Sequence, residues 1–253
     1  DRLIGRLEDP ETRKRITEDM KKGLPGWDNF AKDSGLENIL IFTAERDKSL
    51  EGRTIGDVAA ERGDDVLQTF YDIVVSERGN STVAMFCQSE SDNRRIIAHP
   101  LSMIGSDSHP AATSGVYASR RSHPRAFGTF PRVLGKYVRE DHVLPLETAI
   151  WKMTGFPAQR YRLADRGLIR KGLVADLVAF APDAVRDRAD FRDTNVPSEG
   201  VRFVWKRGTL VVRDGRMVAG PGLMDGFAGQ GRQRLNQKAK RQEDTPGHGR
   251  PPV

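Results

Sequence analysis

The alternation of extended and helical patterns over the first 160 residues constrains the fold of this chain more than any other feature. Short runs of apolar and β-branched residues predict strands, and amphipathic spacing between them predicts helices. The strands are expected at residues 37–42, 82–87 and 101–106, and the helices near residues 10–20, 55–60, 66–78, 94–98, 130–140 and 146–154. Strands that alternate with helices are typical of α/β folds with parallel βα units, in a barrel or a layered sheet.

Polar residues mark several helix starts within this alternation. Asp9 precedes Pro10, which suits the first position of a helix because that position needs no N–H partner. Thr54 and Asp57 have the spacing of a capping box, with a shorter acid than usual. Asp65 stands before an apolar stripe of helical period. These local signals predict where three helices begin.

After Arg160 the pattern changes to short strands joined by tight turns, which predicts antiparallel β-structure. The strands and turns are expected at 172–181, 201–205, Lys206–Gly208, 209–212 and Asp214–Gly215. Beyond residue 222 the periodicity ends, so we expect disorder there. The predicted organisation is therefore an α/β part over residues 1–160, a smaller β part over 161–222 and a disordered basic tail over 223–253.

The net charge of +6 is concentrated at the carboxyl-terminal end of the sequence. Residues 230–253 carry six basic and two acidic side chains, whereas the rest of the chain is nearly neutral. A basic tail can bind nucleic acid or an anionic membrane. No aromatic residue follows Phe227 to stack on bases, so we expect a solvated tail and no nucleic-acid partner.

Cysteine content and hydropathy narrow the class of protein further. A single cysteine excludes an internal disulfide and a Cys-based zinc cluster, and Cys87 lies in an apolar run where we expect it to be buried. The sequence contains no run of 18 apolar residues and no signal-peptide pattern. We therefore expect a soluble, cytoplasmic protein without a membrane partner.

One predicted strand ends in a carboxylate, and a basic side chain follows in the next loop. Asp107 comes at the end of the run over residues 101–106, and His123-Pro-Arg125 precedes a predicted helix. In barrel enzymes catalytic side chains gather at the carboxyl ends of strands. From the local sequence, Asp107 is either an acid that transfers protons or a residue that forms a turn or helix cap. Arg125 is either a two-point anion binder or a surface arginine.

Other common site patterns are missing around Asp107. The sequence has no His-x-His pair, no Cys/His cluster and no Gly-rich phosphate loop. A serine hydrolase built on Ser106, Asp107 and His109 is excluded, because the members of a catalytic triad converge from separate elements. The chain therefore presents an acid and a cation that resemble half of an active site.

A series of ordered motifs gives this half-site a family context. The motifs are Met103–Asp107, His123–Arg125, Gly128–Gly135, Lys136–Glu140, Leu146–Ile150, Lys152–Thr154, Pro157–Arg160, Asp165–Ile169, Gly172–Val178, Gly208 and Asp214–Gly215. Together they resemble the N-acyl-D-amino-acid deacylase (D-aminoacylase) family of the amidohydrolase superfamily. The resemblance covers residues 1–222 and is strongest from 101 to 182. So many motifs in the same order are a more specific signal than any single one.

The resemblance implies a fold for the chain. The family combines a metal-dependent (β/α)8 barrel with a small β-sandwich built from both ends of the chain. The order of the motifs implies that residues 1–160 are the later βα units of the barrel and that residues 161–222 are the carboxyl-terminal share of the sandwich. The family's His-x-His pair and its mid-barrel Cys/His ligands would precede Asp1. We therefore expect a carboxyl-terminal portion that is inactive alone.

The resemblance also implies roles for individual residues. Asp107 matches the family's catalytic aspartate, which contacts the metal-bound water, accepts its proton and returns it to the leaving amine; it is also a possible ligand of the catalytic zinc. Arg125 matches the family's binder of the substrate carboxylate, and His123 is placed with it as a substrate-binding candidate. Ser108 and His109 depart from the family, which commonly has glycine directly after the aspartate.

The implied function is hydrolysis of the amide bond of N-acyl-D-amino acids, which are small-molecule substrates, with zinc in the complete enzyme. A cyclic amidohydrolase similar to dihydroorotase or hydantoinase is an alternative, and a degenerate, non-catalytic relative is another.

Overall fold

Two units make up the chain, and each is built from segments that are separated in the sequence. The computed structural model describes residues 2–109, 111–118 and 121–218. One unit comprises Asp1–Met153 and Arg186–Ser198, and the other comprises Thr154–Val185 and Glu199–Val253. The tail expected to be disordered, 223–253, lies outside the described residues, and the assignment of 1–160 to a barrel and 161–222 to a sandwich stays a prediction.

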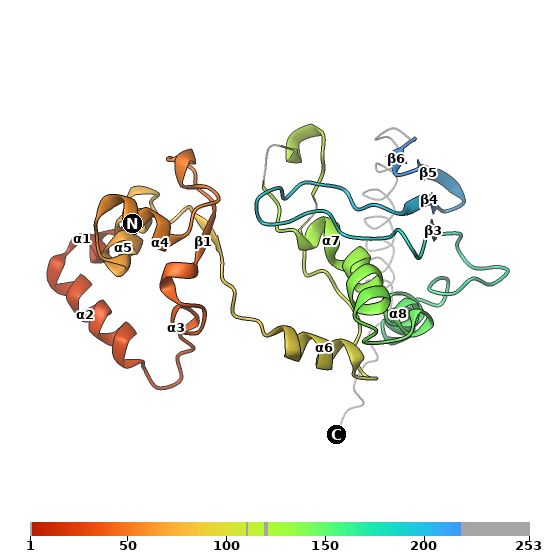
Figure 1. Cartoon of the computed structure of the whole chain (residues 1–253), viewed down its shortest axis with the longest axis horizontal. Coiled ribbons are helices and arrows are strands. Elements are labelled where there is room, and N and C mark those ends of the chain that lie inside the picture. Colours follow the sequence, from red (N-terminus) through yellow and green to blue (C-terminus); the bar gives the residue numbers. More distant parts are fainter. Residues whose placement is uncertain (1, 110, 119–120, 219–253) are drawn as a thin grey trace, which may run out of the picture. The chain divides into compact units, whose positions relative to one another are not determined.

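The first unit is mainly helical (Figure 1). Its helices are α1 (Arg2–Glu8), α2 (Pro10–Lys22), α3 (Phe30–Ser34), η1 (Leu36–Asn38), η2 (Lys48–Leu50), α4 (Ile55–Arg62), α5 (Val66–Ser76), α6 (Glu90–Ala98), η3 (Gly115–Tyr117), α7 (Arg125–Arg132), η4 (Val133–Glu140) and α8 (Leu146–Met153). Its strands are β1 (Leu40–Thr43) and β2 (Thr82–Ala84). The helices expected near residues 10–20, 55–60, 66–78 and 146–154 are all present.

Strand β1 lies at the centre of the core of the amino-terminal helices. One of its faces packs with Leu50, Ile55, Val58 and Ile73 from η2, α4 and α5. Leu40 and Phe42, which alternate with Ile39 and Ile41 along the chain, pack instead with Ala84 and Phe191. Both faces of β1 are therefore buried, which explains why residues 39–42 are all apolar.

The pairing of β1 corrects the expectation of parallel βα units for these two strands. β1 pairs with β2 in the antiparallel sense, with Leu40 opposite Ala84 and Ile41 opposite Val83. Strand β2 is also shorter than the apolar run 82–87, and Met85, Phe86 and Cys87 are exposed. The expectation that Cys87 is buried is therefore wrong, because the chain leaves the sheet after Ala84.

Side-chain caps begin the helices where the sequence predicted them. The Asp9 carboxylate accepts the backbone N–H of Thr12 at 2.8 Å, and Asp65 accepts those of Leu67 and Gln68. Thr54 and Asp57 form a reciprocal capping box, with both hydrogen bonds at 3.0 Å. Each cap satisfies amide donors that have no partner within the helix.

Two further elements differ from the sequence prediction. Residues 101–106 form no strand: the segment runs without regular structure from the end of α6 towards Asp107. The helix expected at 130–140 is α7 followed directly by η4, a π-helix over Val133–Glu140. Pro131 lies inside α7 and donates no backbone hydrogen bond, which weakens the α-helical pattern just before the π-helix begins.

The second unit contains α9 (Gly155–Arg160) and a four-stranded antiparallel sheet in the order β3-β4-β5-β6. Its strands are β3 (Leu177–Phe180), β4 (Val201–Lys206), β5 (Thr209–Arg213) and β6 (Arg216–Met217). The turns at Arg207–Gly208 and Asp214–Gly215 have positive φ angles at both residues, as two-residue hairpins require. The predicted hairpins are therefore confirmed.

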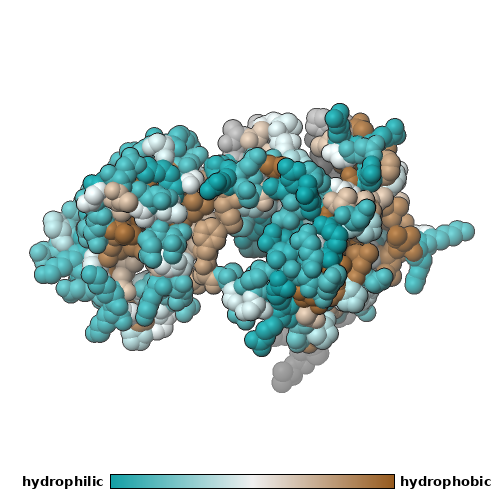
Figure 2. All heavy atoms as spheres, in the orientation of Figure 1, coloured by the Kyte–Doolittle hydropathy of each residue, from teal (hydrophilic) through white to brown (hydrophobic). Residues whose placement is uncertain are grey.

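The surface of the amino-terminal helices is mainly hydrophilic in the face shown in Figure 2, and α2 has no buried residue. None of the helices in the described part of the chain is both long enough and apolar enough to cross a membrane.

Candidate functional site

The structure brings Asp107 and Arg125 together. Arg125 is the first residue of α7, and its Nη1 lies 3.3 Å from Oδ2 of Asp107. The Asp107 side chain is 91% exposed and that of Arg125 is 41% exposed, so both groups remain open to a ligand from solvent. Asp107 has a φ of 47°, a left-handed conformation that is uncommon for a residue with a side chain.

His123 lies beside this pair but faces an aromatic environment. Its Nδ1 accepts the backbone N–H of Arg125 at 3.1 Å, which leaves the proton of the neutral ring on Nε2. The ring packs edge-on against Phe191, with 5.0 Å between centroids, and lies 6.4 Å from Phe42. Burial lowers the pKa of His123, and the Arg125 guanidinium lowers it further. His123 is thus fixed by the Arg125 N–H and by the aromatic rings around it, with a pKa below its ordinary value.

Arg121 anchors the other end of this loop, a role that the sequence did not indicate. Its Nη2 donates to the carbonyl oxygen of Phe191 at 2.8 Å, and its guanidinium lies 5.5 Å from the centre of the Phe42 ring. Asn195 accepts the N–H of Ser122 at 3.2 Å. These partners lie about 70 to 80 residues away in the sequence, so no local pattern could have revealed them.

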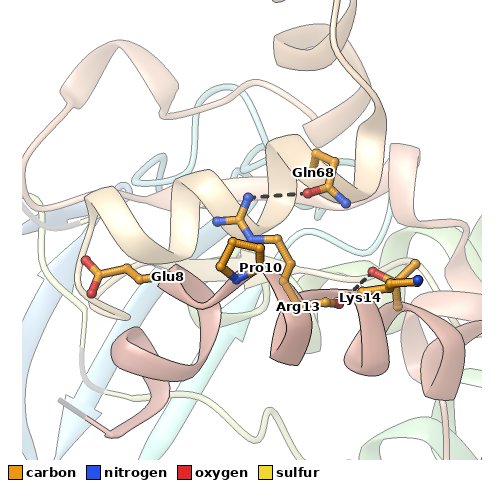
Figure 3. A pocket seen from close by; sticks show the side chains of 6 residues that line it. Glu8, Pro10, Arg13, Lys14 and Gln68 are labelled. Carbon is orange, nitrogen blue, oxygen red and sulfur yellow. Dashed lines mark hydrogen bonds between the residues drawn. The ribbon is translucent and has the colours of Figure 1, made fainter.

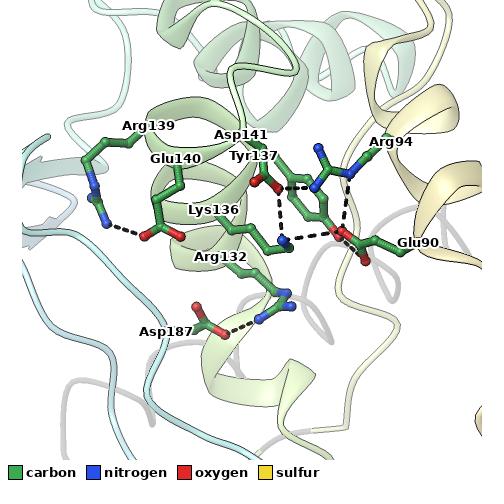
Figure 4. Close-up of polar contacts among 9 residues, drawn as sticks. All are labelled: Glu90, Arg94, Arg132, Lys136, Tyr137, Arg139, Glu140, Asp141 and Asp187. Atoms are coloured by element: carbon green, nitrogen blue, oxygen red, sulfur yellow. Dashed lines mark hydrogen bonds and ion pairs between the residues drawn. The ribbon is translucent and has the colours of Figure 1, made fainter.

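An ion-pair network holds the helices that follow Arg125 (Figure 4). Asp141 accepts from Arg94 of α6 at 2.7 Å and pairs with Lys136 of η4 at 2.9 Å. The hydrogen bond from Lys136 is the main reason that the pKa of Asp141 is lowered, and the same bond raises the pKa of Lys136. Arg132 at the end of α7 pairs with Asp187 at 3.0 Å. The network fixes α6, α7 and η4, the elements on either side of the Asp107 loop.

The described residues do not build a metal site on their own. No group of three or more His, Cys, Asp or Glu side chains with a suitable arrangement occurs among them. The carboxylate of Asp107 pairs with a guanidinium rather than with a second acid or histidine, and His109 is exposed. A catalytic zinc takes three protein ligands as a rule. The described part of the chain therefore offers Asp107 as one carboxylate and no complete set.

A separate hollow of about 440 Å³ lies between the first helices and α5 (Figure 3). It is lined by Glu8, Pro10, Arg13, Lys14, Thr17 and Gln68. Arg13 already donates to Leu7, Gln68 and Asp72 and lies over the ring of Tyr71. The contacts of the Arg13 guanidinium are thus used to pack the helices together. Arg13 is therefore not available to bind an anion in the hollow.

The model of the amidohydrolase family matches residues 17–212 of the chain. A D-aminoacylase from Alcaligenes xylosoxydans xylosoxydans is 44% identical over 162 residues, which are 64% of this chain and 31% of the relative. An N-acyl-D-aspartate deacylase from the same organism is 39% identical over 160 residues, 63% of this chain and 30% of the relative. These matches confirm the resemblance that the motifs indicated.

The solved structures give the same result for the fold. The N-acyl-D-glutamate deacylase from Bordetella bronchiseptica, solved with zinc and a phosphonate that mimics the tetrahedral intermediate, aligns with a TM-score of 0.62 at 33% identity. The alignment covers 74% of this chain and 38% of that chain. The chain thus shares the fold of part of an amidohydrolase and spans about a third of the length of the relatives it matches.

Proposed function

The chain belongs to the amidohydrolase family, and from that premise we propose that it supplies the proton-transferring aspartate and the carboxylate-binding arginine for hydrolysis of N-acyl-D-amino acids. The observation that carries the proposal is the 3.3 Å approach of Arg125 to Asp107. An acid and a planar cation side by side can address two groups of one small substrate: the amide that breaks and the carboxylate next to it. The three relatives described above, all named for this substrate class, support it.

In the proposed reaction Arg125 holds the α-carboxylate through two parallel N–H···O hydrogen bonds. Asp107 accepts a proton from the attacking water as the new C–O bond forms. It then delivers that proton to the nitrogen as the C–N bond breaks, so that a carboxylic acid and a D-amino acid leave. His123 keeps the start of α7 in place through its bond to the Arg125 N–H, and we propose that it thereby helps to shape the substrate-binding loop.

Zinc belongs to the proposal for the complete enzyme, because one relative was solved with it. The described residues of this chain do not fit a zinc ion on their own. We propose that Asp107 contributes one carboxylate to the metal site and that the remaining ligands lie outside the described residues. We also propose the finer fold: later βα units of a (β/α)8 barrel followed by part of a β-sandwich.

A fusion tests the proposal. The chain replaces the matched segment of the 44% identical D-aminoacylase, and release of D-amino acid from N-acetyl-D-amino acids is measured, with the L-enantiomers and a cyclic ureide as comparisons. We expect turnover of the D-substrates. A folded, zinc-loaded fusion without such turnover would show that the proposed function is wrong.

Substitution of the aspartate in this fusion tests its role. Asp107→Asn keeps the size of the side chain but cannot carry the proton, so kcat is expected to fall by about 10²–10⁴-fold. Asp187→Asn is the matched control, because it weakens another Asp–Arg pair on α7 and should leave kcat near that of the parent. Unchanged turnover in Asp107→Asn would remove the aspartate from the mechanism.

Substitution of the arginine separates binding from chemistry. Arg125→Ala is expected to raise KM by about tenfold or more for substrates with a free carboxylate, because a charge-assisted two-point contact is lost. Arg125→Lys should recover only part of the affinity, since lysine lacks the planar fork. An equal effect on carboxamide analogues would contradict the role of Arg125.

A further inference from the structure

Lys152, in the last turn of α8, has a buried side chain that pairs with no acid among the residues that the structure describes. The residue is 1% exposed. Its Nζ donates to the backbone oxygen of His99, to the backbone oxygen of Ser102 at 3.1 Å and to the hydroxyl of Ser102 at 2.8 Å. The three donors of the ammonium thus end on three oxygens of a single turn.

This arrangement is costly compared with an apolar side chain of the same length. A buried charge must regain from the protein the hydrogen bonds that it loses with water. Burial accordingly lowers the pKa of Lys152. A methionine at this position would fill similar space without that cost, so volume alone does not account for the lysine. What the ammonium adds is a fixed position for the turn it binds.

The turn held by Lys152 begins the segment that leads to Asp107. Within it, the N–H of Ser102 donates to the His99 oxygen at 3.1 Å. Two residues later the N–H of Ile104 donates to the backbone oxygen of Lys152 at 3.2 Å. Both the side chain and the backbone of one residue therefore hold residues 99–104. Asp107 follows three residues after Ile104.

Apart from the contacts with Lys152, the hydrogen bonds of this turn in the described chain are local: the Leu101 N–H donates to Nδ1 of His99 at 3.3 Å, and the Ser102 hydroxyl lies 2.9 Å from the His99 oxygen and 3.5 Å from that of Ile97. Residues 101–106 belong to no strand, so no ladder of hydrogen bonds sets their register. Leu101 is 76% exposed and contributes little packing. Because the segment lacks a sheet, its position depends on the contacts with Lys152 at its start and on the Asp107–Arg125 pair at its end.

From this geometry we propose that Lys152 is a positioning residue: it fixes the 99–104 segment so that the Asp107 carboxylate is presented beside Arg125. The importance of that placement for catalysis rests on the proposed function, but the placement itself does not. Lys152 contacts neither Asp107 nor Arg125 in the described structure, so its effect on them must pass through the segment.

The test uses NMR on the full chain without substrate or metal, so its outcome is independent of whether the protein hydrolyses amides. The Nε–Hε signal of Arg125 is assigned by its loss in Arg125→Lys, and its shift in Asp107→Asn defines the broken ion pair. We expect Lys152→Met to move the Arg125 signal towards its position in Asp107→Asn and to speed exchange of the Ile104 amide about tenfold. Lys152→Arg, which keeps the charge, should restore much of both.

Glu77→Gln is the matched control, because it weakens a buried charged group elsewhere in the same unit and should leave the Arg125 signal unchanged. A folded Lys152→Met protein with wild-type Arg125 and Ile104 signals would overturn the proposal. So would an equal shift in Glu77→Gln, since the effect would then report general destabilisation.

Ser102→Ala covers the case in which Lys152→Met does not fold. It removes one of the three oxygens that Lys152 binds and keeps the lysine. We expect a smaller shift of the Arg125 signal in the same direction and a rise of about threefold in Ile104 exchange. Wild-type values of both quantities in Ser102→Ala would contradict the proposal.

Discussion

The Glu77 carboxylate shows at the scale of one residue how a buried charge can be stabilised by backbone alone. It is fully buried and accepts the N–H groups of Glu45, Arg46 and Asp47 at 2.6, 2.9 and 2.8 Å. Burial by itself raises the pKa of this carboxyl, but the three hydrogen bonds outweigh it and leave the pKa below the ordinary value. The ionised side chain therefore fixes the loop after β1.

Glu77→Gln is expected to lower the free energy of unfolding by about 1–3 kcal/mol at neutral pH, because the amide group turns donors towards N–H groups that need an acceptor. The folded pKa is depressed, so this stabilisation is present above the ordinary pKa of about 4.3 and is lost as the pH falls below it. Urea unfolding at pH 7 and below pH 4 checks both points. Glu61→Gln, at an exposed ion pair, should change stability little.

Protonation of His123 makes the folding stability depend on pH in a higher range than protonation of Glu77 does. Its pKa is lowered in the folded state by burial and by Arg125, so the unfolded chain binds the proton more readily. Stability is then complete above the ordinary pKa of about 6.5 and falls as the pH drops from there towards the folded pKa. Titration of the ring by NMR should give a pKa that rises when Arg125 is replaced by alanine. No change in that variant would show that burial alone sets the pKa.

At the scale of the element, local caps are where the sequence is most informative. Thr54 begins α4 through a reciprocal pair of hydrogen bonds with Asp57. Thr54→Ala is expected to cost about 1 kcal/mol of unfolding free energy, because one amide donor of the first turn loses its acceptor. Thr54→Ser keeps the hydroxyl and should recover most of that loss. Thermal unfolding measures both variants, and equal stability of Thr54→Ala and the parent would contradict the role of the cap.

The caps at Asp9, Thr54 and Asp65 could be predicted because their partners lie within three residues. The same holds for the hairpin turns of the second unit. The sequence could not show that residues 101–106 form no strand. In the structure this segment is bonded to Lys152, about 50 residues away, and not to a neighbouring strand. Spacing of apolar residues also does not separate an α-helix from the π-helix η4, since both bury one face.

The antiparallel pairing of β1 with β2 also could not be predicted, because it depends on contacts between residues far apart in the sequence. Apolar runs separated by helices predict strands but do not state their direction. In the structure the β1 face that carries Leu40 and Phe42 is covered by Ala84 of β2 and by Phe191, from a segment more than a hundred residues further along. Of the candidate site, the sequence indicated Asp107, His123 and Arg125. It missed Arg121 and Lys152, whose roles depend on tertiary partners.

At the scale of the whole molecule, the supply of metal ligands decides what this chain can do by itself. A shortened chain of residues 1–218 would include all the described residues. These residues contain no cluster of three or more side chains that could hold a metal ion. A ligand that binds only the folded state, at a free concentration of a hundred times its Kd, raises the free energy of unfolding by about 2.7 kcal/mol. In a domain of this size that gain raises Tm by about 5–10 °C.

We therefore expect zinc to leave the Tm of the 1–218 chain unchanged, and a chelator to have no effect either. The chain of residues 1–253 serves as the comparison, because residues 219–253 add His248 and three acids, Asp225, Glu243 and Asp244. In the fusion with the D-aminoacylase segment, the same titration should raise Tm if the remaining ligands come from that segment. A zinc-dependent rise in the 1–218 chain would show that the described residues assemble a metal site after all, and Asp107→Asn in that chain would then reveal whether its carboxylate is a ligand.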